Sequence, residues 1–218
     1  MGEFDFSVIF DNLPFLLKGM QTTLLLTFLA MVGGIVLGTL LALARISSIK
    51  PLSIVAASYI NFFRSLPLIL VIFWFYFLVP LVLGRPVGGF YSVLVAFTLF
   101  EAAYYAEIIR AGITSVRAGQ FQAARALGLT YGQSMRFIVL PQAFKAMVPV
   151  LLTQGIILFQ DTSLVYVVGL KDFLVSAELI ANRDQRLIEM FTFVAIVYLI
   201  ISYSASQGVR LLQRRMQR

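Results

Sequence analysis

The stretch MQTTLLLTFLAMVGGIVLGTLLALA, from Met20 to Ala44, contains no charged residue over 25 positions. As a helix it would be roughly 37 Å long at ~1.5 Å per residue, which exceeds the ~30 Å hydrocarbon core of a bilayer. Its glycines Gly33, Gly34 and Gly38 would let helix backbones approach closely, either within one subunit or between two. The stretch therefore predicts a membrane-spanning helix.

The rest of the chain has the same apolar character. Hydrophobic residues make up 60% of the 218 residues, charged residues 12%, and the mean hydropathy is +0.93. Soluble domains of this size do not have such a composition, and the length is nearly consumed by spanning segments. The sequence contains no cysteine and no histidine, so disulfides, thiolate nucleophiles and a zinc site are not expected.

Five apolar segments predict an all-α, polytopic membrane protein. We place the spans at about 20–44, 65–83, 90–109, 146–170 and 190–209, in a single transmembrane domain over residues 1–218. Pro67 is expected to break the long apolar run that begins at Pro51, because one straight helix of that length would overshoot the bilayer. Residues 1–20 lack a basic n-region, so they do not read as a cleaved signal, and the first helix is expected to direct targeting.

The basic residues predict the orientation of these spans. Twelve Lys and Arg residues fall on one side and five on the other, and the four arginines of the C-terminal tail are on the richer side: Arg210, Arg214, Arg215 and Arg218. Because positive loops are retained in the cytoplasm, the N-terminus is expected outside and the C-terminus inside. The charges are dispersed rather than clustered with aromatics, so the net charge of +7 does not indicate nucleic-acid binding.

The longest polar connection, about 117–141, carries a spaced motif within GQFQAARALGLTYGQSMRFIVLPQAF. Its fixed positions are Gln122, Ala123, Ala124, Gly128, Ile138, Leu140 and Pro141. Good helix formers over 120–127 predict a short helix with Ala123, Ala124 and Leu127 on one side, and Gly128 is suited to end it in a left-handed conformation. The residue types alone would also suit an ordinary interfacial connector.

The spacing of this motif resembles the EAA loop of permease subunits of ABC importers, whose coupling helix sits in a cleft of an ATP-binding subunit. Gln122 stands where that family usually has Glu, which keeps the hydrogen-bonding capacity and loses the charge. Phe63–Leu68, Ala103–Arg110 and Gln160–Leu164 resemble the FRGTPL, AYxxExxR and KDTSL segments of polar amino-acid permeases, with Ser-Leu for Gly-Thr and Gln for Lys. FEAAYYAEIIRAGI and LFQDTSLVYVVGL are most similar to the glutamate/aspartate-type members.

Ionisable residues inside apolar segments are the candidates for a substrate pathway, since each costs ~2.5–3.5 kcal/mol on insertion scales. We assign to it Arg64, Glu101, Asp161, Thr162 and Ser163. The planar fork of Arg64 could hold a substrate α-carboxylate beside the broken helix. An ion pair of Arg64 with Asp161 or Glu101, or a position at the cytoplasmic interface, are the alternatives.

The sequence also predicts roles for two hydroxyl groups and for one local ion pair. The hydroxyls of Thr162 and Ser163 could satisfy freed carbonyls or bind a substrate ammonium. Glu107 and Arg110 are three residues apart, a spacing at which opposite charges on a helix meet, and a local structural pair is expected.

The resemblance implies a permease subunit of an ATP-driven amino-acid importer in the bacterial inner membrane. It implies as partners two ATP-binding subunits, a second copy or a homologous permease, and a periplasmic or lipid-anchored solute-binding protein. The sequence has no GxxxxGK[ST] loop, so ATP and Mg are expected on the partner, with no cofactor and no catalytic residue in this chain. The implied substrate is glutamate or aspartate, with glutamine or arginine, lysine and histidine as alternatives.

Two other classes of function fit parts of the sequence. An intramembrane enzyme could use Glu101, Glu107 and Asp161 as acid and base, but the chain has no histidine, cysteine or nucleophile motif. An ATP-independent carrier or channel fits the composition and leaves the spacing of the polar loop unexplained.

Overall fold

The computed structural model describes residues 6–216, and helices account for nearly all of them. The α-helices are α1 (Ser7–Asp11), α2 (Leu13–Ile46), α3 (Lys50–Arg64), α4 (Leu68–Phe73), α5 (Val79–Leu83), α6 (Gly89–Thr114), α7 (Ala118–Ala126), α8 (Tyr131–Ser134), α9 (Leu140–Asp161), α10 (Phe173–Asp184) and α11 (Leu187–Met216). Two π-helical turns, Trp74–Leu78 and Met135–Val139, and a 3₁₀ helix, Thr162–Val168, join some of them. Residues 6–216 contain no β-strand, in agreement with the all-α prediction.

Helix length and composition match the predicted membrane architecture. Four helical segments of residues 6–216 are long and apolar enough to cross a bilayer: Leu13–Ile46, Gly89–Thr114, Tyr131–Val168 and Leu187–Met216. A fifth span results if Lys50–Arg64 and Leu68–Leu83 count as one broken span. The break falls at Ser65–Pro67, because proline provides no N–H for a continuing helix. The polytopic all-α fold is therefore confirmed.

Several helices extend beyond the apolar cores that the sequence delimits. The first begins at Leu13 rather than Met20, and the helix of the fourth predicted span begins at Leu140 rather than Ala146. Flanking turns can join a helix whose hydrogen bonds are already propagating, since elongation costs less than nucleation. The expectation for residues 1–20 falls partly outside the described residues, and Arg218 of the tail lies outside them.

The chain forms two compact units, and four long helices each contribute residues to both of them: α2, α6, α9 and α11. The first unit comprises the described part of residues 1–32 together with 67–98 and 155–206. The second comprises 33–66, 99–154 and the described part of 207–218. Each unit has its own hydrophobic core.

In the second unit, α2 packs directly on α6 through two of the glycines noted in the sequence. A Cβ added to Gly34 would lie 3.0 Å from the Tyr105 ring, and one added to Gly38 would lie 2.9 Å from the carbonyl oxygen of Ala102. The two helix backbones thus approach more closely than any side chain would permit. Gly34 and Gly38 therefore serve packing within one subunit.

Replacing Gly38 with valine is expected to lower the stability of the protein by ~1–3 kcal/mol, because the added methyl groups must displace the backbone of α6. The measurement is thermal unfolding of the purified protein in detergent. Gly208→Ala is the control, since a Cβ at Gly208 meets nothing within 4 Å. Equal stability of the two variants would contradict the packing described for α2 and α6.

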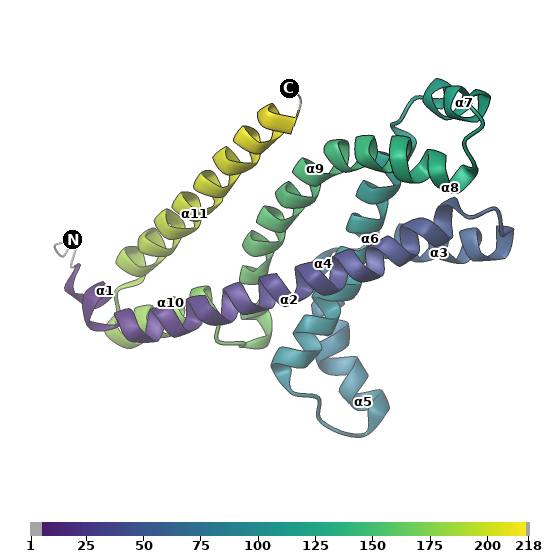
Figure 1. The fold of residues 1–218 in the computed structure, drawn as a ribbon. Coiled ribbons are helices and arrows are strands. Elements are labelled where there is room, and N and C mark those ends of the chain that lie inside the picture. Colours follow the sequence, from purple (N-terminus) through teal and green to yellow (C-terminus); the bar gives the residue numbers. More distant parts are fainter. Residues whose placement is uncertain (1–5, 217–218) are drawn as a thin grey trace. The chain divides into compact units, whose positions relative to one another are not determined.

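In the first unit, α10 lies beside the N-terminal part of α2 (Figure 1) and also contacts α11. Leu16, Phe173, Ile180 and Met190 are buried in the core that these three helices share. A hydrogen bond from the Phe173 amide to the Thr23 hydroxyl joins the start of α10 to α2 at 3.0 Å. Residues about 150 positions apart in sequence thus form one packed core.

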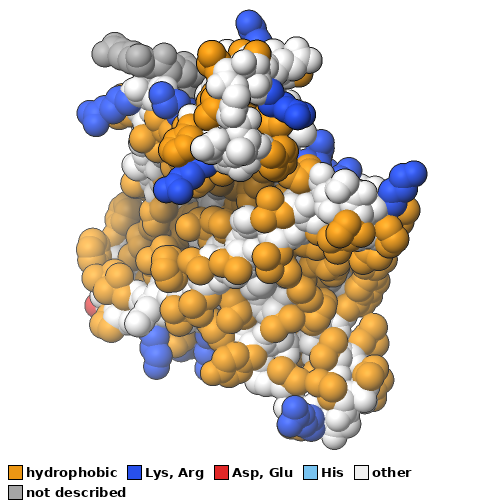
Figure 2. Space-filling view, turned by 45° about the vertical axis from the view of Figure 1, so that its right-hand side comes forward, with side chains coloured by type: hydrophobic (Ala, Val, Ile, Leu, Met, Phe, Trp, Pro, Cys, Tyr) orange, Lys and Arg blue, Asp and Glu red, His pale blue; other side chains and the backbone are white. Residues whose placement is uncertain are grey.

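The surface of the protein suits a bilayer. Figure 2 shows hydrophobic side chains over most of the face in view, with Lys and Arg side chains gathered at its margins. Among the exposed apolar residues, Leu81 and Val82 are 76% and 84% exposed. Exposing so large an apolar surface to water is unfavourable, whereas contact with lipid tails is not.

Candidate functional site

The helical hairpin of α7 and α8 joins α6 to α9 and carries the motif found in the sequence (Figure 1). Helix α7 ends at Ala126, and Gly128 follows its C-cap with a φ of +81° in the left-handed region, as the sequence predicted. The Leu129 amide donates to the Ala124 carbonyl at 3.1 Å, and the Gly128 amide donates to the Arg125 carbonyl at 3.0 Å. These two bonds form a Schellman motif, which closes the end of α7.

The next turn starts α8 with a reciprocal capping box. The Thr130 amide donates to the Gln133 side-chain oxygen at 2.9 Å, and the Gln133 amide donates to the Thr130 hydroxyl at 3.3 Å. The sequence reading missed this feature, although Thr130-x-x-Gln133 is a recognisable capping pattern. The Phe121 and Tyr131 rings pack edge to face across the hairpin, with centroids 5.7 Å apart. The hairpin therefore has a defined shape of its own.

The exposed side of α7 differs from the one that the sequence predicted. Ala124 is buried, whereas Ala123 is exposed and Leu127 is 80% exposed. Ala124 therefore does not share an exposed face with Ala123 and Leu127, because it packs inward on its own hairpin. Gln122, Ala123 and Leu127 are exposed and form what we call the docking face.

The second half of the motif continues from the hairpin into α9. Ile138 is half-buried, while Leu140 and Pro141 are exposed in the first turn of α9. Pro141 has no N–H for the carbonyl four residues back, and the preceding turn, Met135–Val139, is widened into a π-helix. The coupling segment predicted at 117–141 thus ends inside a continuous helix rather than in a loop.

Glu101 lies in the second unit and is fully buried. The side-chain amide of Gln154 donates to its two carboxylate oxygens at 3.3 and 3.1 Å, which joins α6 to α9. A buried carboxylate needs such partners, because an unmade hydrogen bond to a charged group is costly. The sequence identified Glu101 but not Gln154, which is 53 residues away.

Arg64 occupies the last turn of α3, beside the break at Pro67. Its guanidinium lies over the Tyr104 ring, 5.5 Å from the centroid, a cation–π geometry. In the described part of the chain no carboxylate forms an ion pair with Arg64. The guanidinium is exposed in this single chain, and it interacts electrostatically with the Glu107 carboxylate.

Glu107 of α6 links this helix to the end of α2 in the second unit. Its carboxylate accepts hydrogen bonds from the Arg110 guanidinium, including one from Nε at 3.1 Å, which confirms the predicted local pair. Arg45 at the end of α2 also donates to it, at 3.0 Å. The sequence could not predict this second contact, because Arg45 is 62 residues from Glu107.

Replacing Glu107 with glutamine is expected to lower stability by ~1–3 kcal/mol, because two guanidinium groups lose their common carboxylate. Thermal unfolding in detergent would measure it. The double variant Arg45→Gln with Glu107→Gln should recover part of the loss, since one of the two like charges is then gone. A Glu107→Gln protein as stable as the parent would show that this ion-pair cluster contributes nothing.

Asp161, Thr162 and Ser163 lie in the first unit, where α9 changes into the 3₁₀ helix. The buried Thr162 hydroxyl donates to the Phe159 carbonyl at 2.7 Å, so one of the predicted hydroxyls does satisfy a freed carbonyl. Asp161 and Ser163 are half-buried. Arg64 and Glu101 belong to the second unit, so the five candidate pathway residues are divided between the two units.

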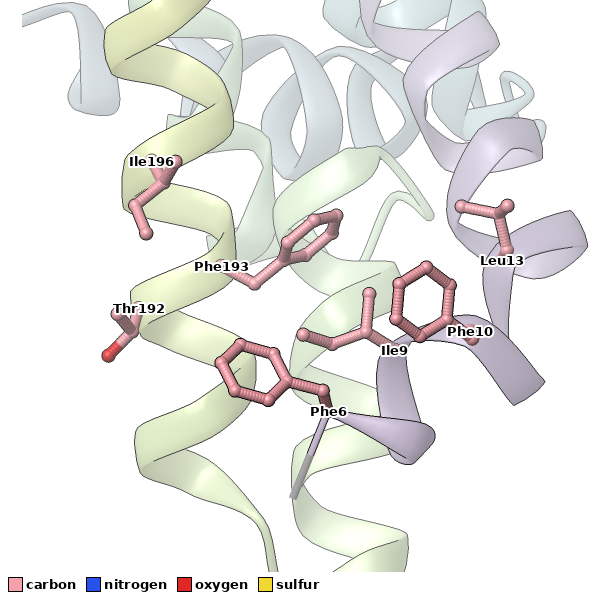
Figure 3. A pocket seen from close by; sticks show the side chains of 7 residues that line it. All are labelled: Phe6, Ile9, Phe10, Leu13, Thr192, Phe193 and Ile196. Carbon is pink, nitrogen blue, oxygen red and sulfur yellow. The ribbon is translucent and has the colours of Figure 1, made fainter. Parts of the chain in front are cut away.

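An apolar pocket of about 220 Å³ lies in the first unit between α1, the start of α2 and α11. Figure 3 shows Phe6, Phe10 and Phe193 around it, while the hydroxyl of Thr192 points away. Its seven lining residues supply no charged group. A zwitterionic amino acid would lose its hydration there without compensation, so the pocket is not a substrate site.

Comparisons with known proteins agree with this architecture. The family model described as "Binding-protein-dependent transport system inner membrane component" matches residues 13–218. The glutamate/aspartate import permease protein GltK of Escherichia coli O6:H1 is 53% identical over 222 residues, which cover 99% of each chain. The probable glutamine ABC transporter permease protein GlnM of Bacillus subtilis is 39% identical, over 97% of this chain and 98% of its own.

Solved structures show the same fold. A crystal structure of an amino acid ABC transporter with histidines matches 97% of this chain and 98% of its own, with a TM-score of 0.92 and 35% identity. The MetNI methionine ABC transporter matches with a TM-score of 0.77 at 23% identity, which is evidence for the fold alone. The resemblance drawn from the sequence motifs is confirmed. The chain belongs to the family of inner membrane components of binding-protein-dependent transport systems.

Proposed function

We propose that this chain, a multi-pass permease subunit of an ABC importer, translocates glutamate and aspartate. The observation that carries the proposal is its 53% identity, over 99% of both chains, with a glutamate/aspartate import permease. The glutamine-type relative is 39% identical. The acidic substrate is thus favoured over glutamine and over the basic amino acids.

Arg64 is the residue that we assign to the substrate carboxylate. Its guanidinium forms no salt bridge in residues 6–216, and it lies on Tyr104 beside a broken helix. A planar fork binds a carboxylate through two parallel hydrogen bonds, which a neutral side chain cannot match. Glu101, Asp161, Thr162 and Ser163 are proposed to belong to the substrate pathway, with the Ser163 hydroxyl as a candidate partner of the substrate ammonium.

The docking face of α7 is proposed to bind an ATP-binding subunit. Gln122, Ala123 and Leu127 are exposed on a short helix whose end is closed by the Schellman motif. A thin helix with one large apolar side chain suits a groove on a partner. ATP and Mg would be bound and ATP hydrolysed on that partner, with no cofactor in this chain.

The assembly that follows contains two permease subunits, either two copies or this chain and a homologue, and two ATP-binding subunits. A periplasmic or lipid-anchored binding protein would deliver the amino acid from outside. We propose that the N-terminus lies outside and the C-terminus in the cytoplasm, which places the α7–α8 hairpin on the cytoplasmic side with the ATP-binding subunits.

Uptake of labelled glutamate by cells that lack their own acidic amino-acid transporters tests the substrate. The cells would express this chain with its partner subunits. Excess unlabelled aspartate is expected to block uptake, and excess glutamine or arginine is not. Uptake of labelled glutamine or arginine, with none of glutamate, would overturn the assignment.

A further inference from the structure

Asp172, in the short connection before α10, has a buried carboxyl group with one unpartnered oxygen. The residue is fully buried, and its Oδ1 accepts a hydrogen bond from the Val175 amide at 2.8 Å as the N-cap of α10. Its Oδ2 is buried without any hydrogen-bond partner. A buried ionised oxygen without a donor is unfavourable, so this atom requires an explanation.

The groups around Asp172 come from three helices and include no cation. The Thr23 hydroxyl of α2 accepts a hydrogen bond from the amide of Phe173, the residue after Asp172. Helix α2 also packs closely at Gly19, where an added Cβ would lie 2.6 Å from the Asp172 carbonyl oxygen and 2.4 Å from the Ser176 hydroxyl. Tyr198 of α11 interacts electrostatically with the carboxyl group and is the titratable group that faces it. Within residues 6–216 no Lys or Arg pairs with Asp172.

One proton would remove the uncompensated charge of this buried carboxyl group. The hydroxyl of Tyr198 is also buried without a hydrogen-bond partner. Protonation removes the charge from the Asp172 carboxyl group, so that Oδ2 is no longer an ionised oxygen buried without a donor.

Burial raises the pKa of Asp172 to about 6, against the opposing effect of hydrogen bonds from the start of α10 and from Thr23. A folded-state pKa above the unfolded value means that Asp172 binds its proton more tightly in the folded protein than in the unfolded one. The stabilisation of the folded protein by this proton is therefore complete below the unfolded pKa, near 3.8, and is lost as the pH rises through about 6.

We propose that Asp172 is a proton-binding site, whose protonation from the outer side holds α10 against α2 and α11. The outer location rests on the orientation proposed above, whereas the proton site itself does not depend on which amino acid is transported. Acidic external conditions would tighten this junction, and alkaline conditions would loosen it. Transport would then respond to external pH through the mobility of α10.

Hydrogen exchange of the assembled transporter tests the proposal directly. After correction for intrinsic rates, protection of a peptide spanning Phe173 and Val175 should increase as the pH falls from about 7.5 to 4.5. The increase should be roughly 25-fold over this range, because the pKa is about 6 in the folded protein and 3.8 in the unfolded one, and the full effect is reached only below 3.8. Asp172→Asn keeps an N-capping side chain and should remove this pH dependence.

Asp184→Asn is the matched control at the other end of α10. The Arg183 guanidinium holds the pKa of the half-buried Asp184 below its usual value, so this carboxylate stays ionised throughout the range. The control should retain the pH dependence of the parent. Protection that does not change with pH in the parent, or that changes equally in Asp172→Asn, would overturn the proposal.

A second measurement does not depend on any variant folding well. The infrared carbonyl band of a protonated carboxylic acid should disappear from the parent transporter as the pH rises through about 6. If Asp172→Asn assembles, the band should be missing from it at all pH values. An unchanged band in that variant would assign the proton to another group, and no band in the parent would also overturn the proposal.

Discussion

Replacing Arg64 with alanine is expected to lower glutamate transport by about 10- to 100-fold while the complex with the ATP-binding subunits still assembles. The loss corresponds to roughly 1.5–3 kcal/mol, the usual contribution of a hydrogen bond to a charged group. Arg64→Lys should have an intermediate effect, because an ammonium keeps the charge and loses the planar fork. The measurement is the initial rate of labelled glutamate uptake as a function of substrate concentration.

Two controls separate substrate contact from a structural role of Arg64. Arg85→Ala removes an exposed loop arginine and should leave uptake unchanged. Tyr104→Leu removes the ring under the guanidinium and keeps the charge, so it should reduce uptake less than Arg64→Ala. If Arg64→Ala reduced assembly as much as transport, or left substrate affinity unaltered, the assignment of Arg64 to the substrate would be wrong.

Replacing Gly128 with valine is expected to abolish ATP-coupled transport. The φ of +81° costs an ordinary residue roughly 1–2 kcal/mol, and a β-branched side chain more. Since the Schellman bonds close α7 around this residue, the docking face would lose its fixed position. Stimulation of ATP hydrolysis by the substrate-loaded binding protein should fall to the basal level.

Gly119→Ala is the matched control for Gly128. Both glycines have open space around the position of a Cβ, but only Gly128 has a positive φ. The control variant should therefore couple normally, and Gly128→Ala should be weaker than the parent and stronger than Gly128→Val. Normal coupling in Gly128→Val would show that the geometry of this turn is not required for docking.

Local patterns in the sequence predicted the features that depend on neighbouring residues. The uncharged run at Met20–Ala44, the break at Pro67 and the left-handed Gly128 all follow from composition or backbone chemistry within a few positions. The pair of Glu107 with Arg110 follows from helical spacing in the same way. Such features can be predicted because no tertiary contact is needed to produce them.

The missed features depend on residues far apart in the chain. Gln154 contacts Glu101, and Arg45 contacts Glu107, only after the helices have packed, and no spacing rule links them. Asp172 stands next to Lys171 in a short polar connection, which gives no sign that its carboxyl group is buried. The inward side of Ala124 was missed because it depends on the folding of the hairpin onto itself.

Uptake of labelled glutamate into proteoliposomes is the most direct test of the central claim, that this chain is an importer subunit driven by ATP. The liposomes would contain the assembled transporter, with the binding protein outside and ATP inside. Uptake should require ATP and the binding protein, and it should stop with a non-hydrolysable ATP analogue. Uptake that continued without ATP, or without the ATP-binding subunits, would contradict the account and indicate an ATP-independent carrier.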